Sequence, residues 1–125
     1  MLKSKSINWK DIKHFSKSEF ECPCCSKILV SRKLVLMLDL ARSLAGVPFK
    51  ISSGFRCKKH NKKVSGVKNS AHLTGLAVDI EVPNNVARLK ILRALVIVGF
   101  NRIGISKGFI HVDVDKTKPN NIWLY

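Results

Sequence analysis

Apolar residues recur at helical spacing in two long segments of the chain. In residues 31–46 (SRKLVLMLDLARSLAG) the apolar positions share one face, the opening serine is placed as an N-cap and the closing glycine as the stop. Residues 86–99 (VARLKILRALVIVG) form the second such segment, with either of the two preceding asparagines as its cap. The pattern predicts two long helices, and the short segment 58–64 (KKHNKKV) has room for one or two helical turns.

Other apolar runs alternate or are rich in β-branched residues, as strands are. Residues 47–53 (VPFKISS) alternate, and residues 75–82 (GLAVDIEV) form a β-rich run that ends at a proline. Near the C-terminus, residues 101–106 (NRIGIS) and 109–115 (FIHVDVD) flank a Lys-Gly pair, which is typical of a hairpin. Helices and strands are mixed without a βαβ repeat, so we expect an α+β fold: a small, mainly antiparallel sheet packed against helices.

The length and composition of the chain fit one folded domain. At 125 residues the chain can bury one core, and 46% of its residues are hydrophobic while 25% are charged. No repeat or Pro/Gly-rich linker divides it, so we expect residues 1–125 to form a single domain. The polar, basic segment 1–20 carries isolated apolar residues, and we expect these to pack it on that domain.

Two features of the sequence argue against a signal peptide and a membrane span. The N-terminus (MLKSKSINWKDIKHF) is charged throughout and lacks the apolar run of about 7–15 residues found in a signal peptide. The longest apolar run, ALVIVGF, is far shorter than the ~20 residues that cross a bilayer. We therefore expect a chain without a transmembrane segment that is cytoplasmic when it is synthesised.

The chain is strongly basic, with 23 Lys and Arg against 8 Asp and Glu and a net charge of +15. This excess predicts an anionic partner, which can be nucleic acid, an anionic membrane or the acidic polymers of a bacterial cell wall. Charge alone does not choose among the three. Because the lysines are scattered along the whole length, we expect the basicity to belong to the folded surface rather than to a tail.

Four cysteines form a cluster of three, in the segment CPCC, and one distant member. Structural zinc sites use cysteine pairs with about two to four residues between them and combine two such pairs. Only Cys22 and Cys25 fit that spacing, Cys57 would supply a third ligand, and the sequence shows no obvious fourth. Packed thiols, Cys24 included, or a disulfide to Cys57 formed outside the cell explain the pattern better, and the sequence does not rank these two.

Two histidines and two aspartates lie in patterns that suit a metal site. In the segment FIHVDVD a strand would place His111 and Asp113 on one face and the intervening apolar residues on the core face. Upstream, His72 precedes Asp79 by seven residues, and Gly75 allows a turn between them. Zinc binds imidazole nitrogen and carboxylate oxygen, and catalytic zinc uses three protein ligands plus water. His72, Asp79 and His111 supply this set, although a surface histidine and polar residues on a solvent-facing strand explain the same spacing.

Three motifs together resemble one known family. Residues 52–57 (SSGFRC), 60–80 (HNKKVSGVKNSAHLTGLAVDI) and 108–114 (GFIHVDV) look like the successive motifs of the zinc D-alanyl-D-alanine carboxypeptidase family. That family includes phage endolysins that cut peptidoglycan stem peptides, and it shares its fold with the hedgehog signalling domain. The resemblance runs over about residues 15–114, and EFECPCC (19–25) resembles the opening segment of a phage-associated branch.

The resemblance implies a zinc site and roles for five residues. His72, Asp79 and His111 would be the zinc ligands. Arg56 would hold a carbonyl or carboxylate of the substrate, which suits its fixed charge and forked donors, and a surface ion pair is its alternative role. Ser70 would contact substrate or orient a ligand, and capping of a turn is the alternative for this residue.

The general base of the family has no counterpart in this chain. Some members carry a glutamate three residues before the last zinc histidine and others a histidine two before it, but Gly108 and Phe109 occupy these positions here. Asp113 lies on the same strand face as His111 and is our candidate base. It can equally orient His111 as an outer carboxylate. His60 is a weaker candidate that we expect on a helix surface.

The resemblance implies a zinc-dependent peptidase that hydrolyses a stem-peptide bond of peptidoglycan with metal-activated water, as a D-Ala-D-Ala carboxypeptidase or an L-Ala-D-Glu endopeptidase. Stem peptides and acidic cell-wall polymers would be the partners of a monomer that acts on the wall after release. A nucleic-acid-binding domain and a non-catalytic cell-wall-binding domain on the same fold, with a degenerate metal site, are the alternatives. The nucleic-acid class explains the charge but not the motifs, and the sequence has no binding motif with interleaved aromatics.

Overall fold

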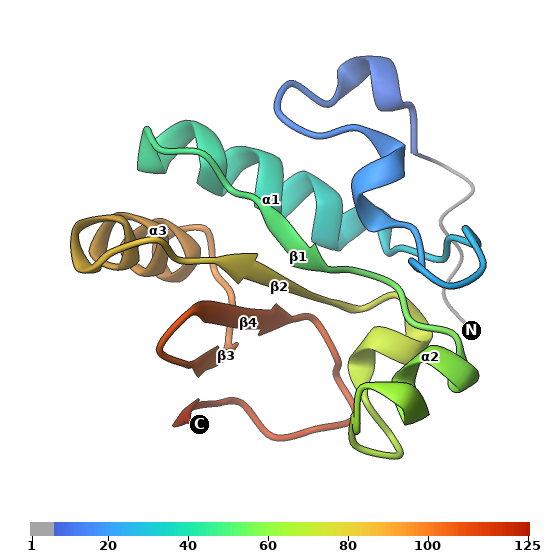
Figure 1. Ribbon diagram of the computed structural model, residues 1–125. Helices are drawn as coiled ribbons and strands as arrows, with labels where there is room; N and C mark the ends of the chain where they lie inside the picture. Colours follow the sequence, from blue (N-terminus) through green and yellow to red (C-terminus); the bar gives the residue numbers. More distant parts are fainter. Residues whose placement is uncertain (1–6) are drawn as a thin grey trace.

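A five-stranded sheet forms the centre of the structure, a computed structural model that describes residues 7–125 (Figure 1). The strands follow the order β1-β2-β4-β3-β5, and every neighbouring pair is antiparallel except β3 and β5, which run parallel. The strand bounds are Ile51–Ser53 (β1), Ala77–Glu81 (β2), Arg102–Ile105 (β3), Phe109–Asp113 (β4) and Asn121–Leu124 (β5). Together with the helices, this sheet confirms the predicted α+β fold.

The first long helix, α1 (Arg32–Ala45), forms where the helical spacing predicts it. The Ser31 side chain accepts a hydrogen bond from the backbone N–H of Leu34 and caps the helix. Gly46, at φ 69°, adopts the left-handed conformation that ends the helix. Local residues therefore decide where α1 begins and ends, while its buried face packs against α3 and the sheet.

The second long helix, α3 (Asn85–Ile97), begins after Asn84, whose side chain accepts a hydrogen bond from the N–H of Ala87. Of the two asparagines that the sequence offers as caps, the first one caps the helix. The helix ends two residues before the predicted stop at Gly99. A short helix, α2 (Lys58–Lys63), occupies the segment in which we expect one or two turns.

The apolar faces of α1, α3 and the sheet share one core. In β4, Ile110 and Val112 are fully buried in this core, as strand alternation predicts, whereas Val114, just after the strand, is only partly buried. Fully buried members from the other elements include Leu34, Leu38, Ile80, Ile91, Leu95 and Ile103. Burial of each such side chain stabilises the fold by about 1.5–3 kcal/mol. The core side of the sheet thus supplies stability, and the polar residues of β4 lie on the other face.

The segment before α1 packs on the core through a few aromatic and apolar side chains. Two short 3-10 turns precede the helix. Phe20 is fully buried, and its ring centroid lies 5.6 Å from that of Trp9 and 5.7 Å from that of Phe15. Within the predicted N-terminal segment 1–20, residues 1–6 lie outside the described residues.

Two strands differ from the sequence-based expectation. β1 covers only the last three residues of segment 47–53, because Pro48 has no N–H for the ladder and the register against β2 shifts after Ile51. The sequence does not predict β5, since four residues are too few for a clear alternating pattern. Its pairing with β3 depends on contacts between segments that are distant along the chain.

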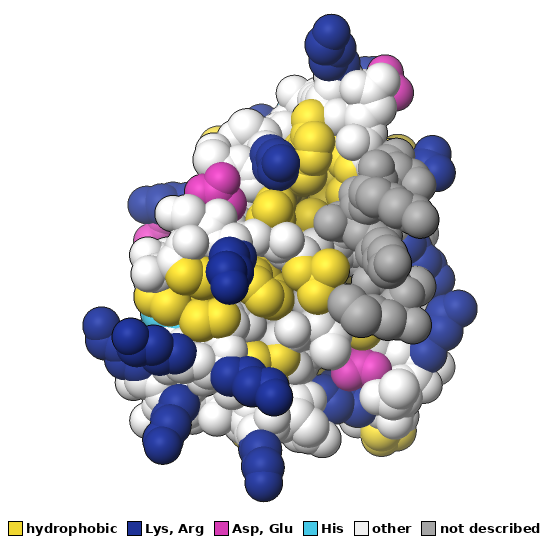
Figure 2. Space-filling model, turned by 90° about the vertical axis from the view of Figure 1, so that its right-hand side faces the viewer, with side chains coloured by type: hydrophobic (Ala, Val, Ile, Leu, Met, Phe, Trp, Pro, Cys, Tyr) yellow, Lys and Arg dark blue, Asp and Glu magenta, His cyan; other side chains and the backbone are white. Residues whose placement is uncertain are grey.

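Basic side chains are spread over the folded surface. Figure 2 views the molecule from the right-hand side of Figure 1 and shows Lys and Arg side chains around most of the outline, with few Asp or Glu. The basic side chains on this face therefore reach solvent. Within residues 7–125 no helix is both long and apolar enough to span a bilayer.

Candidate metal centre

A 3-10 turn, η3 (Ala71–Thr74), carries the first of the predicted ligands. The Ser70 side chain accepts a hydrogen bond from the N–H of His72 at 3.2 Å and caps the turn. Gly75, at φ 73°, ends the turn, and the chain continues into β2, which carries Asp79. The spacing of seven residues between the histidine and the aspartate thus spans one turn and the start of a strand.

Gly75 also lies against the segment before α1. A Cβ atom at this position would stand 2.2 Å from the carbonyl oxygen of Leu29, and the Gly75 carbonyl accepts a hydrogen bond from the N–H of Ser31 at 2.8 Å. The left-handed φ and the close approach both require glycine. The turn that positions His72 is therefore fixed against the start of α1.

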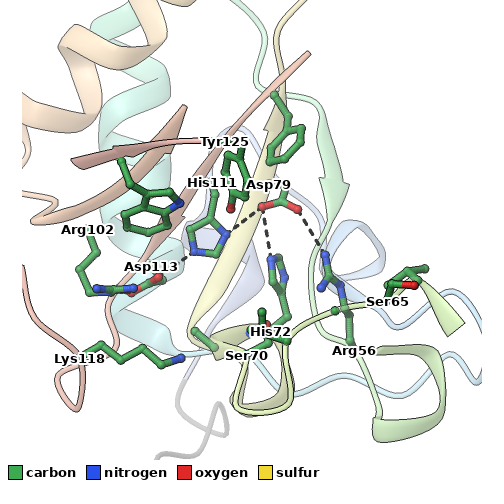
Figure 3. A pocket seen from close by; sticks show the side chains of 16 residues that line it. Arg56, Ser65, Ser70, His72, Asp79, Arg102, His111, Asp113, Lys118 and Tyr125 are labelled. Carbon is green, nitrogen blue, oxygen red and sulfur yellow. Dashed lines mark hydrogen bonds and ion pairs between the residues drawn. The ribbon is translucent and has the colours of Figure 1, made fainter. Parts of the chain in front are cut away.

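Sheet register brings the three predicted ligands together (Figure 3). Asp79 in β2 lies opposite His111 in β4. Asp79 Oδ1 lies 3.0 Å from His111 Nδ1 and 3.3 Å from His72 Nε2, and one donor atom from each residue lies within 4.8 Å of the others. All three side chains are buried. These nitrogen and oxygen donors can hold one metal ion.

The outer ring nitrogens of both histidines are also engaged. His72 Nδ1 lies 2.8 Å from the carbonyl oxygen of Gly54, and His111 Nε2 lies 2.7 Å from Asp113 Oδ2. A histidine that binds a metal uses one ring nitrogen for the ion and donates the other N–H to a carbonyl or carboxylate. The contacts here leave His72 Nε2 and His111 Nδ1 directed at Asp79, so the donor set fits a zinc ion.

Burial and hydrogen bonds act in opposite directions on the charges of this cluster. Burial alone would raise the pKa of Asp79, but hydrogen bonds and positive charge from His111 and His72 lower that pKa below its ordinary range. Burial would likewise raise the pKa of Asp113, whereas His111, a backbone N–H and the guanidinium of Arg102 lower it. Asp113 and Asp79 raise the pKa of His111 against its burial. Both carboxylates are thus ionised near neutral pH.

Asp113 is enclosed by three partners. Besides His111, its carboxylate accepts hydrogen bonds from Arg102 Nε at 2.7 Å and from the N–H of Asp115 at 3.1 Å. The Asp113 side chain is only 1% exposed, so it does not face solvent as an ordinary polar strand residue would. Arg102 is not among the predicted site residues, although the hairpin over the Lys-Gly pair, extended by one residue beyond Ile103 and Val112, sets it opposite Asp113 and could have indicated the contact.

Arg56 reaches the same cluster from the segment between β1 and α2. Its Nη2 lies 3.4 Å from Asp79 Oδ2, while Nε donates to Ser53 at 3.0 Å and Nη1 donates to Asn61 at 3.2 Å. Asn61, which sequence analysis does not single out, is buried and fixes the guanidinium from one side. The Arg56 side chain is 15% exposed, so it is a fixed part of the cluster and not a surface ion pair.

The cluster opens into a cavity of about 400 Å³ (Figure 3). All six predicted site residues line it: Arg56, Ser70, His72, Asp79, His111 and Asp113. Further polar or aromatic lining residues, which the sequence analysis does not assign to the site, are Ser65, Arg102, Phe109, Lys118, Trp123 and Tyr125. His60 lies on α2, outside the residues that line the cavity.

The C-terminal strand covers one side of the centre. The Trp123 ring lies 5.4 Å from that of His111, and the Arg102 guanidinium lies 4.9 Å from the Trp123 ring centroid. In the sheet, Gly104 pairs with His111 on one side and with Trp123 on the other. A Cβ atom on Gly104 would stand 2.6 Å from the indole of Trp123. The absent side chain of Gly104 therefore makes the space that the Trp123 ring occupies.

The fold and the site together define a class of protein. An α+β sheet that presents two buried histidines and an aspartate to an open cavity suits a metal-dependent hydrolase with a single ion. A family model described as Peptidase M15 matches residues 13–113. The chain therefore belongs to the Peptidase M15 family, a family of zinc-dependent peptidases, which confirms the metallopeptidase part of the prediction. No curated protein matches the chain.

Proposed function

We propose that the chain is a zinc-dependent peptidase that hydrolyses a bond in the stem peptides of peptidoglycan. The observation that carries this proposal is the convergence of His72, Asp79 and His111 at a cavity, in a chain of the Peptidase M15 family. Residues 1–125 would act as one peptidase domain and as a monomer, on the cell wall, after release from the cytoplasm.

Three atoms would hold the zinc ion: His72 Nε2, Asp79 Oδ1 and His111 Nδ1. These atoms face one another, while the opposite ring nitrogens are engaged by Gly54 and Asp113. When bound, zinc supplies a Lewis acid that polarises the scissile carbonyl and lowers the pKa of a water molecule. A set of three protein ligands leaves one side of the centre open to the cavity for water and substrate.

Arg56 would bind a carbonyl or carboxylate oxygen of the substrate beside the ligands. Its hydrogen bonds to Ser53 and Asn61 hold the guanidinium in place before substrate arrives. A positive charge that needs no rearrangement stabilises developing negative charge more than a mobile one does. Ser70 caps the turn of His72 and lines the cavity, so it would position this ligand and contact the substrate.

Asp113 would orient His111 and would not move protons. It contacts the ring nitrogen of His111 that points away from Asp79, and it already accepts hydrogen bonds from Arg102 and a backbone N–H. A carboxylate with these three partners and 1% exposure is held in place and shielded from bulk solvent. Such outer carboxylates fix the tautomer and the direction of a ligand histidine.

The charge around the cavity favours an anionic peptide. Arg56, Arg102 and Lys118 line it, and stem peptides carry carboxylates that such cations attract. Lys118 is itself held by the carbonyl oxygen of Asn69 and the carboxylate of Asp115, at 2.6 Å and 3.1 Å. The fixed cations would thus select a peptide with acidic groups near the scissile bond.

Digestion of purified peptidoglycan tests the proposal. We expect the zinc-loaded chain to release products whose masses identify one cleaved bond, D-Ala-D-Ala or L-Ala-D-Glu. A chelator that removes zinc should abolish the release, and added zinc should restore it. Unchanged muropeptide masses, combined with a shift in DNA mobility caused by the same preparation, would support the nucleic-acid-binding alternative instead.

A further inference from the structure

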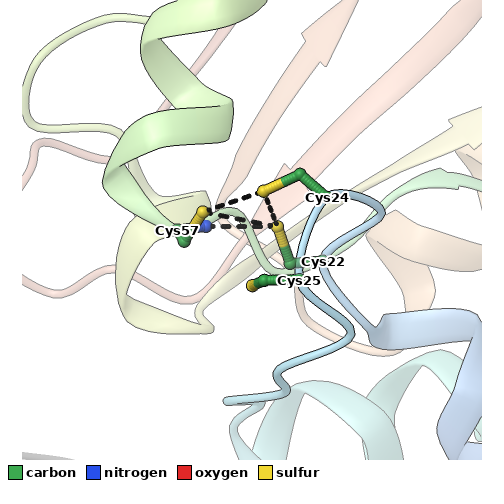
Figure 4. Close-up of side chains that lie close together, drawn as sticks. All are labelled: Cys22, Cys24, Cys25 and Cys57. Atoms are coloured by element: carbon green, nitrogen blue, oxygen red, sulfur yellow. Dashed lines mark hydrogen bonds between the residues drawn. The ribbon is translucent and has the colours of Figure 1, made fainter.

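The four cysteines form a second cluster, and one of its members, Cys57, directly follows Arg56 in the chain (Figure 4). Cys22 Sγ lies 3.5 Å from Cys24 Sγ and 3.7 Å from Cys57 Sγ, and the sulfur atoms of Cys24 and Cys57 are 3.2 Å apart. With Cys25 included, all four sulfur atoms lie within 4.8 Å of one another. The sequence offers no obvious fourth ligand beside Cys22, Cys25 and Cys57, but the fold brings Cys24 to them.

The separations match a shared metal ion better than a disulfide. Four thiolates around zinc, each at about 2.3 Å, stand ~3.8 Å from one another in a tetrahedron. A disulfide bond of about 2.05 Å would join only two of the sulfur atoms. It would leave the other two thiols beside it without a role, whereas one ion uses all four. Tetrahedral sulfur coordination is typical of zinc.

The backbone around the cluster is arranged as it is around a thiolate site. Two backbone hydrogen bonds close the loop of residues 22–27. The N–H of Cys22 donates to the carbonyl oxygen of Lys27 at 2.8 Å, and the N–H of Ser26 donates to the carbonyl oxygen of Cys22 at 2.9 Å. Backbone N–H groups also point at sulfur: that of Cys57 at Cys22 Sγ, at 3.5 Å, and that of His60 at Cys57 Sγ, at 3.4 Å. Such hydrogen bonds to sulfur orient metal ligands and stabilise their charge.

We propose that Cys22, Cys24, Cys25 and Cys57 bind a structural zinc ion as four thiolates, in a site separate from the centre at His72. Four protein ligands close the coordination sphere, so this ion would take no part in hydrolysis. It would instead join the loop before α1 to the start of α2. A metal link that closes the long loop between these two segments stabilises the fold.

The joined segment is the one that supports the candidate metal centre. Between the end of β1 and Cys57, Gly54 accepts a hydrogen bond from His72 Nδ1 at 2.8 Å, and the N–H of Arg56 donates to the His72 carbonyl at 3.1 Å. The N–H of Phe55 donates to the carbonyl oxygen of Phe20, which lies just before the cysteine loop, at 3.1 Å. The structural ion would therefore fix the segment that orients His72 and Arg56.

Metal analysis of the full chain, purified with zinc under reducing conditions, tests the proposal. We expect about two zinc ions per chain, and about one in His72→Ala, where only the cysteine site is left. The double variant Cys24→Ser/Cys25→Ser should lose one ion, and combined with His72→Ala it should lose both. These two cysteines are exposed, so the substitutions leave the core intact. Ser18→Ala, an exposed change in the same N-terminal region, should keep the wild-type zinc content.

Two measurements on His72→Ala avoid any dependence on folding of the cysteine variants. A thiol-blocking mercurial should release its remaining zinc, and replacement of that zinc by cobalt(II) should give the strong near-ultraviolet absorption of sulfur-to-cobalt charge transfer. Because neither readout needs catalysis, failure of the peptidase proposal would leave this result unchanged. A metal-free His72→Ala chain, a disulfide found by mass spectrometry in the reduced preparation, or full zinc content in Cys24→Ser/Cys25→Ser would overturn the assignment.

Discussion

Each histidine of the candidate metal centre is oriented through its outer ring nitrogen. The Gly54 carbonyl lies 2.8 Å from His72 Nδ1, and Asp113 lies 2.7 Å from His111 Nε2. Loss of a metal-binding histidine should therefore reduce zinc binding more than loss of a group that contacts the outer nitrogen of such a histidine. The first removes a donor atom from the ion, and the second only loosens the direction in which a donor points.

We expect His72→Ala to lower zinc content by about one ion per chain, because a ligand atom is lost. Hydrolysis should fall by more than the roughly 10–100-fold that loss of an outer partner costs. Metal analysis and muropeptide release measure the two effects. His14→Ala is the matched control, since this exposed histidine contacts Ser43 away from the cavity and its loss should change neither quantity. Equal zinc content in His72→Ala and the wild type would contradict the ligand assignment.

Asp113→Asn should weaken zinc affinity by roughly 10–100-fold and lower activity in parallel, with recovery when free zinc is raised. The amide keeps the size of the side chain but loses the charge that orients His111. Zinc titrations that follow both bound metal and activity measure this effect. Asp11→Asn, an exposed change, should leave both curves unchanged. Activity lost at unchanged zinc affinity would instead assign Asp113 to proton transfer.

At the scale of elements, two glycines let neighbouring segments approach the centre. Gly75 ends η3 at a left-handed φ and touches Leu29, and Gly104 in β3 makes room for Trp123 of β5. Neither role follows from the spacing of the ligands, because each depends on a segment that is distant along the chain. Substitutions at these positions should therefore disturb the centre without removing any ligand.

Gly75→Ala should lower the free energy of unfolding by about 2–5 kcal/mol, because the left-handed φ costs roughly 1–2 kcal/mol and the contact with the Leu29 carbonyl adds about 1–3 kcal/mol. Gly46→Ala has a similar φ, with nothing within 4 Å of the added atom, so it should cost only about 1 kcal/mol. Urea unfolding of the two variants measures the difference. Equal losses would show that the close approach at Gly75 is unimportant.

Gly104→Ala should displace Trp123 and β5, because the added carbon would stand 2.6 Å from the indole. We expect a loss of about 1–3 kcal/mol in the free energy of unfolding, a change in tryptophan fluorescence and weaker hydrolysis. Gly108→Ala, at a position with nothing within 4 Å, is the control and should behave like the wild type. Unchanged fluorescence and activity in Gly104→Ala would mean that β5 does not shape the cavity.

At the scale of the whole molecule, we expect the net charge to act on encounter with the substrate and not on the chemical step. The chain has 23 Lys and Arg against 8 Asp and Glu, and most of the lysines within residues 7–125 are exposed, whereas the candidate ligands lie buried. Charges at the surface act through solvent and are screened by salt over about 10 Å at 0.1 M and ~3 Å at 1 M. Buried contacts such as those of Asp79 are much less screened.

Hydrolysis of intact cell wall should therefore weaken as salt is raised, because attraction to the acidic polymers is lost. Hydrolysis of a short soluble stem peptide should change far less, since it does not depend on that attraction. Rates for both substrates at low and high ionic strength measure the difference. Equal salt dependence for the wall and the short peptide would show that the net charge plays no part in binding to the wall.

Much of the fold follows from local sequence signals. Ser31, Gly46 and Asn84 fix the ends of the helices through hydrogen bonds or backbone conformations that each residue makes near itself. Strand alternation separates Ile110 and Val112 from His111, and the structure buries both apolar residues in the core. By contrast, β5 is a short strand whose parallel pairing with β3 no local pattern indicates.

The candidate site divides in the same way. The sequence by itself determined which side chains can donate to a metal ion, their order along the chain, and the glycine that allows a turn between His72 and Asp79. These are properties of the residues themselves and need no contact between distant segments. Only the tertiary structure decided that Asp79 lies opposite His111 and that the cysteine sulfur atoms meet. The tertiary structure also decided which residues contact the carboxylates of Asp79 and Asp113. Such contacts join segments far apart in the chain, so they depend on strand register and loop packing, which a linear pattern does not contain.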